Sequence, residues 1–509
     1  MIVTWAWTAF ASEWGQAYQH GLAAVVEVVV RLVDELGGHV AALSARVAVL
    51  ESENTALRAR LGTDSHNSSK PHGQPAAAGA DGPGSRPHPK SQRVVSGRKS
   101  GGQPGHAGHT LRLVEDPDEV AVHGPAHCHA CGENLAGVPA VRHERRQHPH
   151  VGTRDIPPIQ VRVIEHRVET KCCPGCGVET SGAFPAAVAA PVQYGPRVAT
   201  LGVYLNQEQL LPLERTCAVL DEVCGCPISE GTLERAVANC HEQLAETEAA
   251  IKRGIEQAAV AHFDETGVNI GGKLSWLHVA STPDLTFYAA HPKRGRQAMD
   301  AIGVLPAFQG RAVHDGLASY ERYQACTHAL CNAHHLRELT FIEEQLGQPW
   351  AKDLKTVLCE VKQAVDTARG QGLTALPTET KHAFARRYDS VLEAGFQANP
   401  RPAPSGKRGR PKLGKAGSLL QRLREHKEEP LAFMHDFAVP FDNNQADRDI
   451  RMTKVREKIS GCFRTTTGPE RFCRIRGYIS TLRKQGMPIF SALGQAIAGH
   501  PPLPATAGP

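Results

Sequence analysis

The sequence predicts a multidomain α+β protein: an N-terminal coiled coil, a cysteine-bearing ribbon, a helical helix-turn-helix-like domain, and an α/β core with a helical insertion. Three observations predict this organisation. Apolar residues recur with a heptad period near the N-terminus, two Cys-x-x-Cys pairs follow, and strand and helix patterns alternate after residue 255. The chain has 509 residues, 41% of them hydrophobic, so it can bury two or three cores.

Composition excludes several classes of protein. No run of 18 apolar residues is present, so we expect no membrane-spanning helix. The first residues, Met1 to Ala11, lack a basic region and a cleavage site, so we expect no signal peptide and a cytoplasmic protein. In that compartment the 14 cysteines are expected as free thiols or metal ligands.

Basic residues are unevenly spread along the chain. The net charge is only +5, but residues 63–112 hold seven Lys or Arg against two acids, and residues 448–484 hold eleven against three. Such tracts predict a polyanionic partner. If that partner is DNA, the protein is expected to be nucleoid-associated.

Residues 20–62 predict a coiled-coil dimerisation helix. Val or Asn at a positions and mainly Leu at d positions favour two parallel strands. The seam consists of Val26, Val29, Val33, Leu36, Val40, Leu43, Val47, Leu50, Asn54, Leu57 and Leu61. Gly37-Gly38 is expected to interrupt it, and a helix packed on its own domain is the alternative.

Residues 63–112 predict a basic, disordered linker, because Gly, Pro, Ser and Ala dominate there and large apolar residues are almost absent. Its cations, such as Lys70, Arg86 and Arg98, could make non-specific phosphate contacts. A merely solvated linker is an equally good interpretation.

Residues 113–185 predict a zinc-binding ribbon. Cys128 and Cys131 form one pair, and Cys173 and Cys176 form a second pair after 41 residues. Four thiolates at these spacings suit a tetrahedral structural zinc ion. The alternation of residues 161–170 predicts a ribbon strand. A redox pair is the weaker alternative.

Residues 190–252 predict a helical, helix-turn-helix-like DNA-binding region. One helix is expected over 213–223, a turn at Gly225, and a second helix over 231–245 with Ser229 as its N-cap. Arg235 is its candidate for contacting bases. A plain helical hairpin is nearly as good an interpretation.

Residues 255–342 and 431–495 predict a core with the element order of a ribonuclease-H-like fold. Three antiparallel strands are expected over 260–266, 274–280 and 285–290. A helix near 297–302 and a parallel strand over 311–314 follow. In that order Asp264 and Asp315 end neighbouring strands at one sheet edge. Adjacent carboxylates repel unless a cation lies between them, and oxygen ligands suit two Mg²⁺ or Mn²⁺ ions.

An ordered set of motifs resembles the insertion sequence 66 family of transposases, which belong to the DDE superfamily. The set comprises Asn67-Ser68-Ser69-Lys70-Pro71, Gly101-Gly102-Gln103-Pro104-Gly105-His106, both cysteine pairs, Tyr194-Gly195-Pro196-Arg197, Leu213-Glu214-Arg215, Ser229-Glu230-Gly231-Thr232-Leu233, Asp264-Glu265-Thr266, Cys331-Asn332-Ala333-His334 and Asp442-Asn443-Asn444-Gln445-Ala446-Asp447-Arg448. Each motif alone is weak, but their order is specific.

The resemblance implies that Asp264, Asp315 and Asp447 are the catalytic, metal-binding acids. The family has Glu where this chain has Asp447. Because Asp is one methylene shorter, its oxygens lie roughly 1.5 Å further back. A misplacement near 1 Å costs on the order of 100-fold in rate.

Further cations are candidates for DNA contact. His334 and Arg337 follow a short strand, although a helix-start histidine with a structural hydrogen bond fits equally well. Residues near Asp447 share its helix face and suit backbone contact; they are Arg448, Arg451, Lys454 and Lys458. The helical insertion, residues 343–430, carries Arg408-Gly409-Arg410, which resembles a peptide that enters the minor groove.

These features predict a metal-dependent DNA transposase that cuts element ends and joins the 3′-OH to target DNA. Its expected partners are double-stranded DNA of the terminal repeats and target, a second copy or higher oligomer, and accessory proteins of the same element. The alternative is a catalytically decayed, dimeric, zinc-containing DNA-binding protein. A ribonuclease H or junction nuclease is a third interpretation, which explains neither the coiled coil nor the cysteine pairs.

Overall fold

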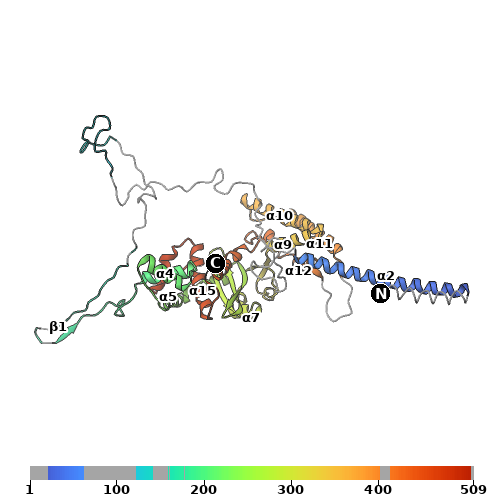
Figure 1. The fold of residues 1–509 in the computed structure, drawn as a ribbon, viewed down its shortest axis with the longest axis horizontal. Coiled ribbons are helices and arrows are strands. Elements are labelled where there is room, and N and C mark those ends of the chain that lie inside the picture. Colours follow the sequence, from blue (N-terminus) through green and yellow to red (C-terminus); the bar gives the residue numbers. More distant parts are fainter. Residues whose placement is uncertain are drawn as a thin grey trace. The chain divides into compact units, whose positions relative to one another are not determined.

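The computed structural model describes residues 21–61, 122–141, 159, 161–172, 174–176, 178–401 and 413–505 (Figure 1). Contacts divide the chain into two compact units. Unit 1 comprises Met1–Gln92, Ala259–Phe263 and Gln309–Asn444; unit 2 comprises Arg93–Ala258, Asp264–Phe308 and Gln445–Pro509. The predicted linker over 63–112, Cys173, and the loop with Arg408 and Arg410 lie outside the described residues.

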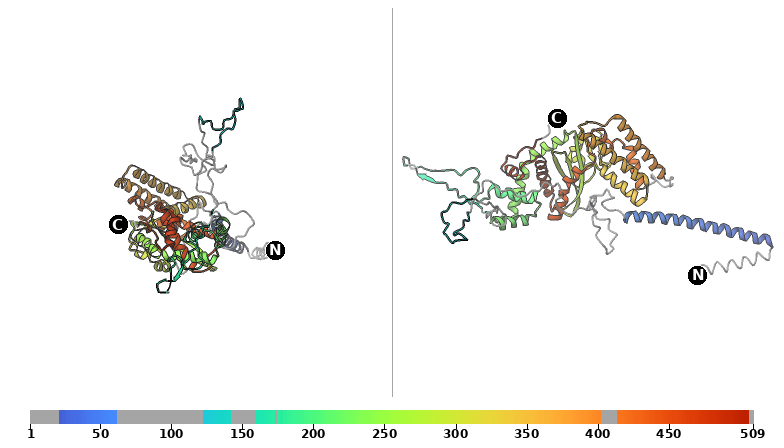
Figure 2. Two further views of the ribbon diagram at one scale, coloured as in Figure 1. Left: turned by 90° about the vertical axis from the view of Figure 1, so that its left-hand side faces the viewer. Right: turned by 90° about the horizontal axis from the view of Figure 1, so that it is seen from above.

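Helix α2 (Leu22–Leu61) is one continuous helix, seen as a long rod in Figure 2. The helix itself continues through Gly37 and Gly38, the residues expected to interrupt the apolar seam. The described side chains of the predicted seam are exposed; they are Val26, Val29, Val33, Val40, Leu43, Val47 and Leu50.

Parallel strands form the sheet portion of unit 1. The first residues of β3 (Val260–Ile270) pair with β6 (Arg311–His314), which pairs in turn with β7 (Thr327–Leu330). A 3₁₀ turn, η2 (Tyr320–Arg322), joins β6 to β7. Ala312, Val313 and Ala329 are buried, as expected of parallel strands covered on both faces.

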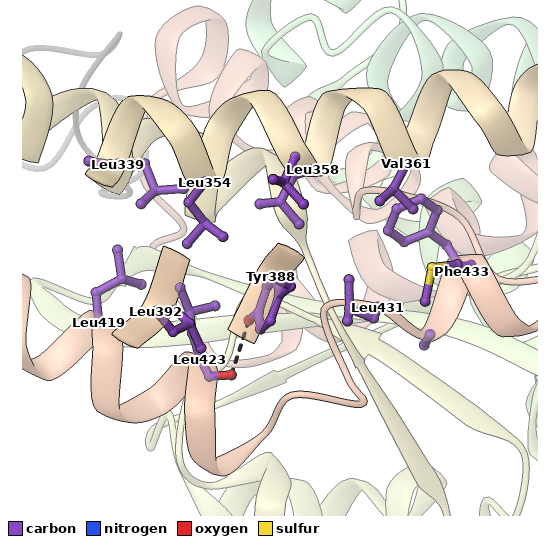
Figure 3. Close-up of a cluster of buried hydrophobic side chains, with 14 of the residues drawn as sticks. Leu339, Leu354, Leu358, Val361, Tyr388, Leu392, Leu419, Leu423, Leu431 and Phe433 are labelled. Carbon is purple, nitrogen blue, oxygen red and sulfur yellow. Dashed lines mark hydrogen bonds between the residues drawn. The ribbon is translucent and has the colours of Figure 1, made fainter. Parts of the chain in front are cut away.

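The helices of unit 1 that follow β7 enclose an apolar core, part of which is drawn in Figure 3. They are α9 (Asn332–Leu346), α10 (Pro349–Gly370), α11 (Thr378–Ala398), α12 (Gly414–Glu425) and α13 (Ala432–His435). Apolar residues along α10 at spacings of three and four meet leucines of α11 and α12. The Tyr388 hydroxyl donates to the carbonyl of Leu423 at 3.0 Å, which satisfies a polar group inside this core. The helices predicted for the insertion are therefore present.

Antiparallel strands form the sheet portion of unit 2. β4 (Lys273–Ser281) pairs with β5 (Thr286–His291), and the complete sheet order is β5-β4-β3-β6-β7. Short helices α7 (Arg296–Ile302) and α8 (Val304–Ala307) follow β5. Helix α15 (Thr467–Lys484) packs closely on β5, since a Cβ at Gly477 would lie 3.0 Å from the Thr286 carbonyl oxygen.

Several further helices of unit 2 pack together with α5 (Glu230–Gln243). They are α3 (Pro196–Val203), η1 (Tyr204–Glu208), α4 (Leu213–Cys224), α6 (Ala245–Glu256) and α16 (Ile489–Ile497). Helix α14 (Asn444–Ser460) packs on β3 instead, in the same apolar cluster as Val268. The two predicted helices, α4 and α5, and the turn between them are present. Gly225 ends α4 in the left-handed conformation, and the Ser229 hydroxyl caps α5 by accepting from the amide of Thr232.

The described residues of the cysteine-bearing segment form little regular structure. A two-stranded antiparallel hairpin joins β1 (Thr170–Cys172) to β2 (Glu179–Ser181). The strand predicted over 161–170 was wrong except at Thr170, because residues 161–169 form no ladder with the part of the chain that is described. Alternation alone is not sufficient for a strand, which also needs a neighbour to accept its hydrogen bonds.

Candidate functional site

Asp264 and Asp315 occupy equivalent positions on paired strands. The parallel register joins His262 to Val313, and each aspartate follows its strand's last registered residue by two positions. Both side chains are half-buried. Asp315 directly follows β6, as predicted. Asp264 does not end its strand, because β3 continues to Ile270; what ends near Asp264 is its parallel pairing.

Backbone amides close in sequence donate hydrogen bonds to the carboxylates of both aspartates. One carboxylate oxygen of Asp264 accepts from the amide of Glu265 at 2.8 Å. One oxygen of Asp315 accepts from the amide of Leu317 at 3.0 Å. These bonds fix one oxygen of each carboxylate and restrict its rotation.

Glu265 is a buried acid that the sequence interpretation missed as a structural group. Its side chain is fully buried and pairs with the guanidinium of Arg294 at 2.8 Å. Arg294 also lies 4.9 Å above the ring of Trp276. The ion pair compensates the charge of Glu265, so the two adjacent acids of β3 have different roles.

Helix α14 runs alongside the second half of β3 within unit 2. The ammonium of Lys454 donates to the Gly267 carbonyl, and the amide of Phe463 donates to the Asn269 carbonyl at 3.1 Å. From Asp447 to Lys454 a helix rises about 10 Å, and from Asp264 to Gly267 a strand spans about 10 Å. The first turn of α14, which contains Asp447, therefore starts near the level of Asp264.

The side chains of α14 fall into two groups. Ala446 and Ile450 are buried in the same apolar cluster as Val268 of β3. Asp447 is half-buried in the first turn, where a carboxylate is favoured by the helix dipole. The helix is thus held against the sheet by its apolar face, and Asp447 is presented at its N-terminal end.

The donor chemistry suits Mg²⁺, because all three predicted ligands are carboxylates. Within the described part of the chain, however, no group of three or more His, Cys, Asp or Glu side chains is arranged so that it could hold a metal ion. The three side chains are therefore of the kind that binds Mg²⁺, but in the described part of the chain they are not gathered into a group that could hold the ion.

The predicted DNA-contacting cations differ in environment. Arg448, Arg451 and Lys458 are exposed along α14, and Arg448 donates to Gln445 at 2.8 Å. Lys454 is half-buried, pairs with Glu457 at 2.9 Å, and helps to hold α14 on β3. Its main contacts are thus internal.

The other predicted contacts lie on α5 and α9. Arg235 is exposed on α5, whose further exposed side chains include Glu230, Glu234 and Glu242. These exposed carboxylates make the surface of α5 unfavourable for contact with DNA phosphates, because like charges repel. His334 and Arg337 lie half-buried in the first turns of α9.

A chain of two imidazoles, His314 (buried) and His328 (half-buried), adjoins Asp315, and sequence patterns did not reveal it. His314 is fully buried, and its Nδ1 lies 3.1 Å from the amide nitrogen of Gly316. Its Nε2 lies 3.0 Å from Nδ1 of His328, whose Nε2 lies 3.1 Å from the carbonyl oxygen of Tyr323. Burial lowers the pKa of His314 to about 3, so this imidazole is neutral near pH 7.

Asn443 lies in the segment before α14 and makes buried hydrogen bonds to other residues of unit 1. It is 1% exposed, and its side chain donates to the Phe263 carbonyl at 2.8 Å. Its Oδ1 lies 2.8 Å from Nδ1 of His262, and its amide donates to the sulfur of Cys331 at 3.1 Å. Asn443 therefore joins β3 to the residue that precedes α9.

Of the four cysteines predicted to bind zinc, the structure describes Cys128, Cys131 and Cys176, and the first two lie in one turn. The Cys128 amide donates to the Glu133 carbonyl at 2.8 Å, and the Gly132 amide donates to the Cys128 carbonyl at 2.9 Å, which closes a tight turn. Hydrogen bonds from the backbone of Ala130 and Cys131 lower the pKa of the Cys128 thiol. Thiolates are the zinc-binding form of cysteine, so this turn suits a metal knuckle.

Comparison with known proteins places this chain in a family. The model of the family described as Transposase IS66 family matches residues 191–471, which is more than half of the chain. No curated protein has a similar sequence. No helix in the described residues is both long and apolar enough to cross a membrane. The matched segment contains strands β3 to β7, α14 and all three aspartates, and the chain therefore belongs to the IS66 family of transposases.

Proposed function

We propose that this protein is a DDE-type transposase that binds the ends of its insertion sequence, cleaves DNA and joins the 3′-OH to a target strand. Membership of the family implies transposase function, DNA as partner and use of divalent metal in general. The observation that carries the finer proposal is the register of β3 and β6, with Asp264 and Asp315 at equivalent positions and α14 bringing Asp447 alongside β3.

The proposed core is ribonuclease-H-like. In its sheet order, β5-β4-β3-β6-β7, the first strand along the chain is central. One side is an antiparallel β4–β5 hairpin, and the other side consists of the parallel strands β6 and β7. A carboxylate on the central strand and one on its parallel neighbour then face a common edge of the sheet.

Asp264, Asp315 and Asp447 would hold two Mg²⁺ or Mn²⁺ ions in this proposal. When bound, such ions supply an activated attacking oxygen and stabilise the leaving oxygen of an in-line displacement. The chain's own residues hold and orient the DNA. The exposed Arg448, Arg451 and Lys458 contact phosphates along α14.

The N-terminal regions serve assembly in the same proposal. The seven exposed seam residues of α2 pair with a second copy, giving a homodimer or a higher oligomer on double-stranded DNA. Cys128, Cys131, Cys173 and Cys176 hold a structural Zn²⁺ ion. Accessory proteins of the element and target DNA complete the assembly.

A strand-transfer assay on element ends with Mg²⁺ tests the catalytic proposal. Asp264→Asn and Asp315→Asn should each lower cleavage on the order of 1000-fold, since a bound metal contributes several kcal/mol. The matched control is Asp300→Asn, which removes an exposed carboxylate that pairs with Arg296 at 3.3 Å. Equal activity of all three variants would exclude these acids from catalysis.

A decayed, zinc-containing DNA-binding protein is the second candidate. Asp447 favours it because this residue is shorter than the family's Glu, and no closed ligand group is formed within the described residues. Binding of element ends without cleavage, with cleavage restored by Asp447→Glu, would support decay. Cleavage without strand transfer would instead indicate a nuclease.

A further inference from the structure

We propose that His314 and His328 are positioning residues that fix the turn bearing Asp315, by a hydrogen-bonded relay from the Tyr323 carbonyl to the Gly316 amide. This inference rests on the proposed function, because it gives these imidazoles a role in orienting a metal ligand. All of the residues involved belong to unit 1.

The direction of every bond in the relay follows from its two ends. The Gly316 amide can only donate, so Nδ1 of His314 accepts and its proton lies on Nε2. The Tyr323 carbonyl can only accept, so His328 carries its proton on Nε2 and accepts at Nδ1. The middle bond, 3.0 Å long, is then a donation from Nε2 of His314 to Nδ1 of His328. The two independent ends require the same pair of tautomers.

Packing makes the relay rigid. The His314 ring is fully buried and stacks on Tyr320, with ring centroids 4.4 Å apart and an angle of 17° between the planes. Tyr320 is itself 1% exposed, and its amide donates to the Leu317 carbonyl at 2.9 Å. Few alternative positions are open to an imidazole enclosed in this way.

The turn held by the relay contains Asp315 between two anchored residues. His314 precedes Asp315 in the chain and Gly316 follows it. The Gly316 amide donates to the His314 ring, so this hydrogen bond spans Asp315. Gly316 has φ of +89°, a conformation that residues with a side chain rarely adopt. The Leu317 amide then donates to Asp315 itself at 3.0 Å. The backbone on both sides of the carboxylate is therefore fixed.

Such fixing matters because metal ligands act only within narrow tolerances. Groups that orient a ligand from behind typically change metal affinity by roughly 10- to 100-fold when they are removed. A turn that moves by about 0.5 Å would already take the carboxylate outside productive geometry. The relay thus gives a role to a buried histidine, His314, and a half-buried one, His328, whose hydrogen bonds in the relay reach the turn beside Asp315 and not its carboxylate.

The test measures Mn²⁺ binding to the full-length protein by calorimetry, with DNA cleavage and thermal unfolding in parallel. His314→Leu and His328→Leu should each weaken Mn²⁺ binding roughly 10- to 100-fold. Asp315→Asn is the reference for loss of the ligand. His278→Asn is the matched control, because it removes another buried imidazole, on β4, that is hydrogen-bonded to Lys293; it should leave Mn²⁺ affinity unchanged even if it lowers the unfolding temperature.

A second pair of variants separates hydrogen bonding from packing and applies if the leucine variants fail to fold. His314→Asn places an oxygen near the former Nδ1 and keeps an acceptor for the Gly316 amide, whereas His314→Gln keeps only the donor toward His328. The Asn variant should bind Mn²⁺ within about threefold of the wild type, and the Gln variant should lose affinity as leucine does. Equal affinities for Asn and Gln would overturn the relay.

The two proposals fail in different ways. The relay proposal alone would be overturned if the leucine variants fold and bind Mn²⁺ as tightly as the wild type while Asp315→Asn has lost Mn²⁺ binding. Unchanged Mn²⁺ affinity and cleavage in Asp315→Asn would overturn the proposed function, and the relay with it.

Discussion

Helices α2 and α10 carry similar apolar patterns but have opposite environments. Both place apolar side chains at spacings of three and four. On α10, Leu354 and Leu358 are fully buried against helices of the same unit, whereas on α2 Leu43 and Leu50 remain 63% and 56% exposed. The comparison teaches that a helical period identifies a face that must be covered, and that the rest of the chain decides whether its own residues cover it.

The largest expected effect is on self-association through α2. Replacing Leu43 and Leu50 together with Lys puts charges into the predicted seam, so we expect the dimer to dissociate fully at micromolar concentration. Analytical ultracentrifugation measures this. The matched control is Val49→Lys, which changes a similarly exposed residue outside the seam; equal behaviour of both proteins would contradict a coiled coil.

A change in the α10 core should act on folding and leave association unaltered. Leu358→Ala removes a fully buried side chain, so we expect the free energy of unfolding to fall by about 2–5 kcal/mol. Urea titration followed by circular dichroism measures the change. Leu373→Ala, at a half-exposed position after α10, should cost less than about 1 kcal/mol. If both variants were equally stable, α10 would not be part of a packed core.

Low pH should lower the free energy of unfolding through a buried histidine of the sheet, and an exposed histidine of α2 should have no such effect. Burial lowers the pKa of His278 to about 4 from its ordinary value of 6.5. Below pH 6.5 the imidazole of His278 is protonated in the unfolded chain, whereas in the folded protein it stays neutral until the pH falls to about 4. Stability is therefore complete above pH 6.5 and decreases by up to about 3 kcal/mol as the pH falls toward 4.

His278→Gln should flatten this part of the pH profile, measured as the difference in urea midpoint between pH 7.5 and pH 5. His39 of α2 is exposed, so His39→Gln serves as the control and should leave the profile unchanged. A wild-type slope in His278→Gln would show that the imidazole is not kept neutral.

The smallest expected effect comes from the buried hydroxyl of Tyr388 in the α10–α12 core. Tyr388→Phe removes the hydroxyl that donates to Leu423 at 3.0 Å and leaves the ring in place. We expect a loss of about 1 kcal/mol, since the carbonyl also loses its partner. Differential scanning calorimetry would detect it. No change in melting temperature would mean that water replaces the hydroxyl.

Local patterns predicted much of the fold. Strands at 274–280, 285–290 and 311–314, the capped helix after Ser229 and the helices of the insertion are present. Their signals are local: period, turn glycines and capping residues. The prediction failed where a strand depends on pairing with a neighbouring strand. Residues 161–169 alternate like a strand but form no ladder with the described part of the chain. Strand β3 extends beyond Thr266, its predicted end, because it has a neighbour on its other side.

The candidate site divides in the same way. Sequence motifs identified the three aspartates and the family, and strand register then set Asp264 and Asp315 at equivalent positions. The buried pair of Glu265 with Arg294, and the ammonium of Lys454 on the Gly267 carbonyl, were not predictable from motifs. Their side chains resemble ordinary charged surface residues until distant segments bury them.

By itself the sequence determined which faces are apolar, where helices and strands begin, and which acids are candidates for metal binding. These properties depend on neighbours a few residues away, through backbone geometry and side-chain period. Only the tertiary structure decided that the α10 stripe is covered and the α2 seam is exposed, and that two histidines on neighbouring strands form a directional relay behind Asp315. Those outcomes depend on contacts between residues far apart in the chain, which arise only when the sheet and helices pack.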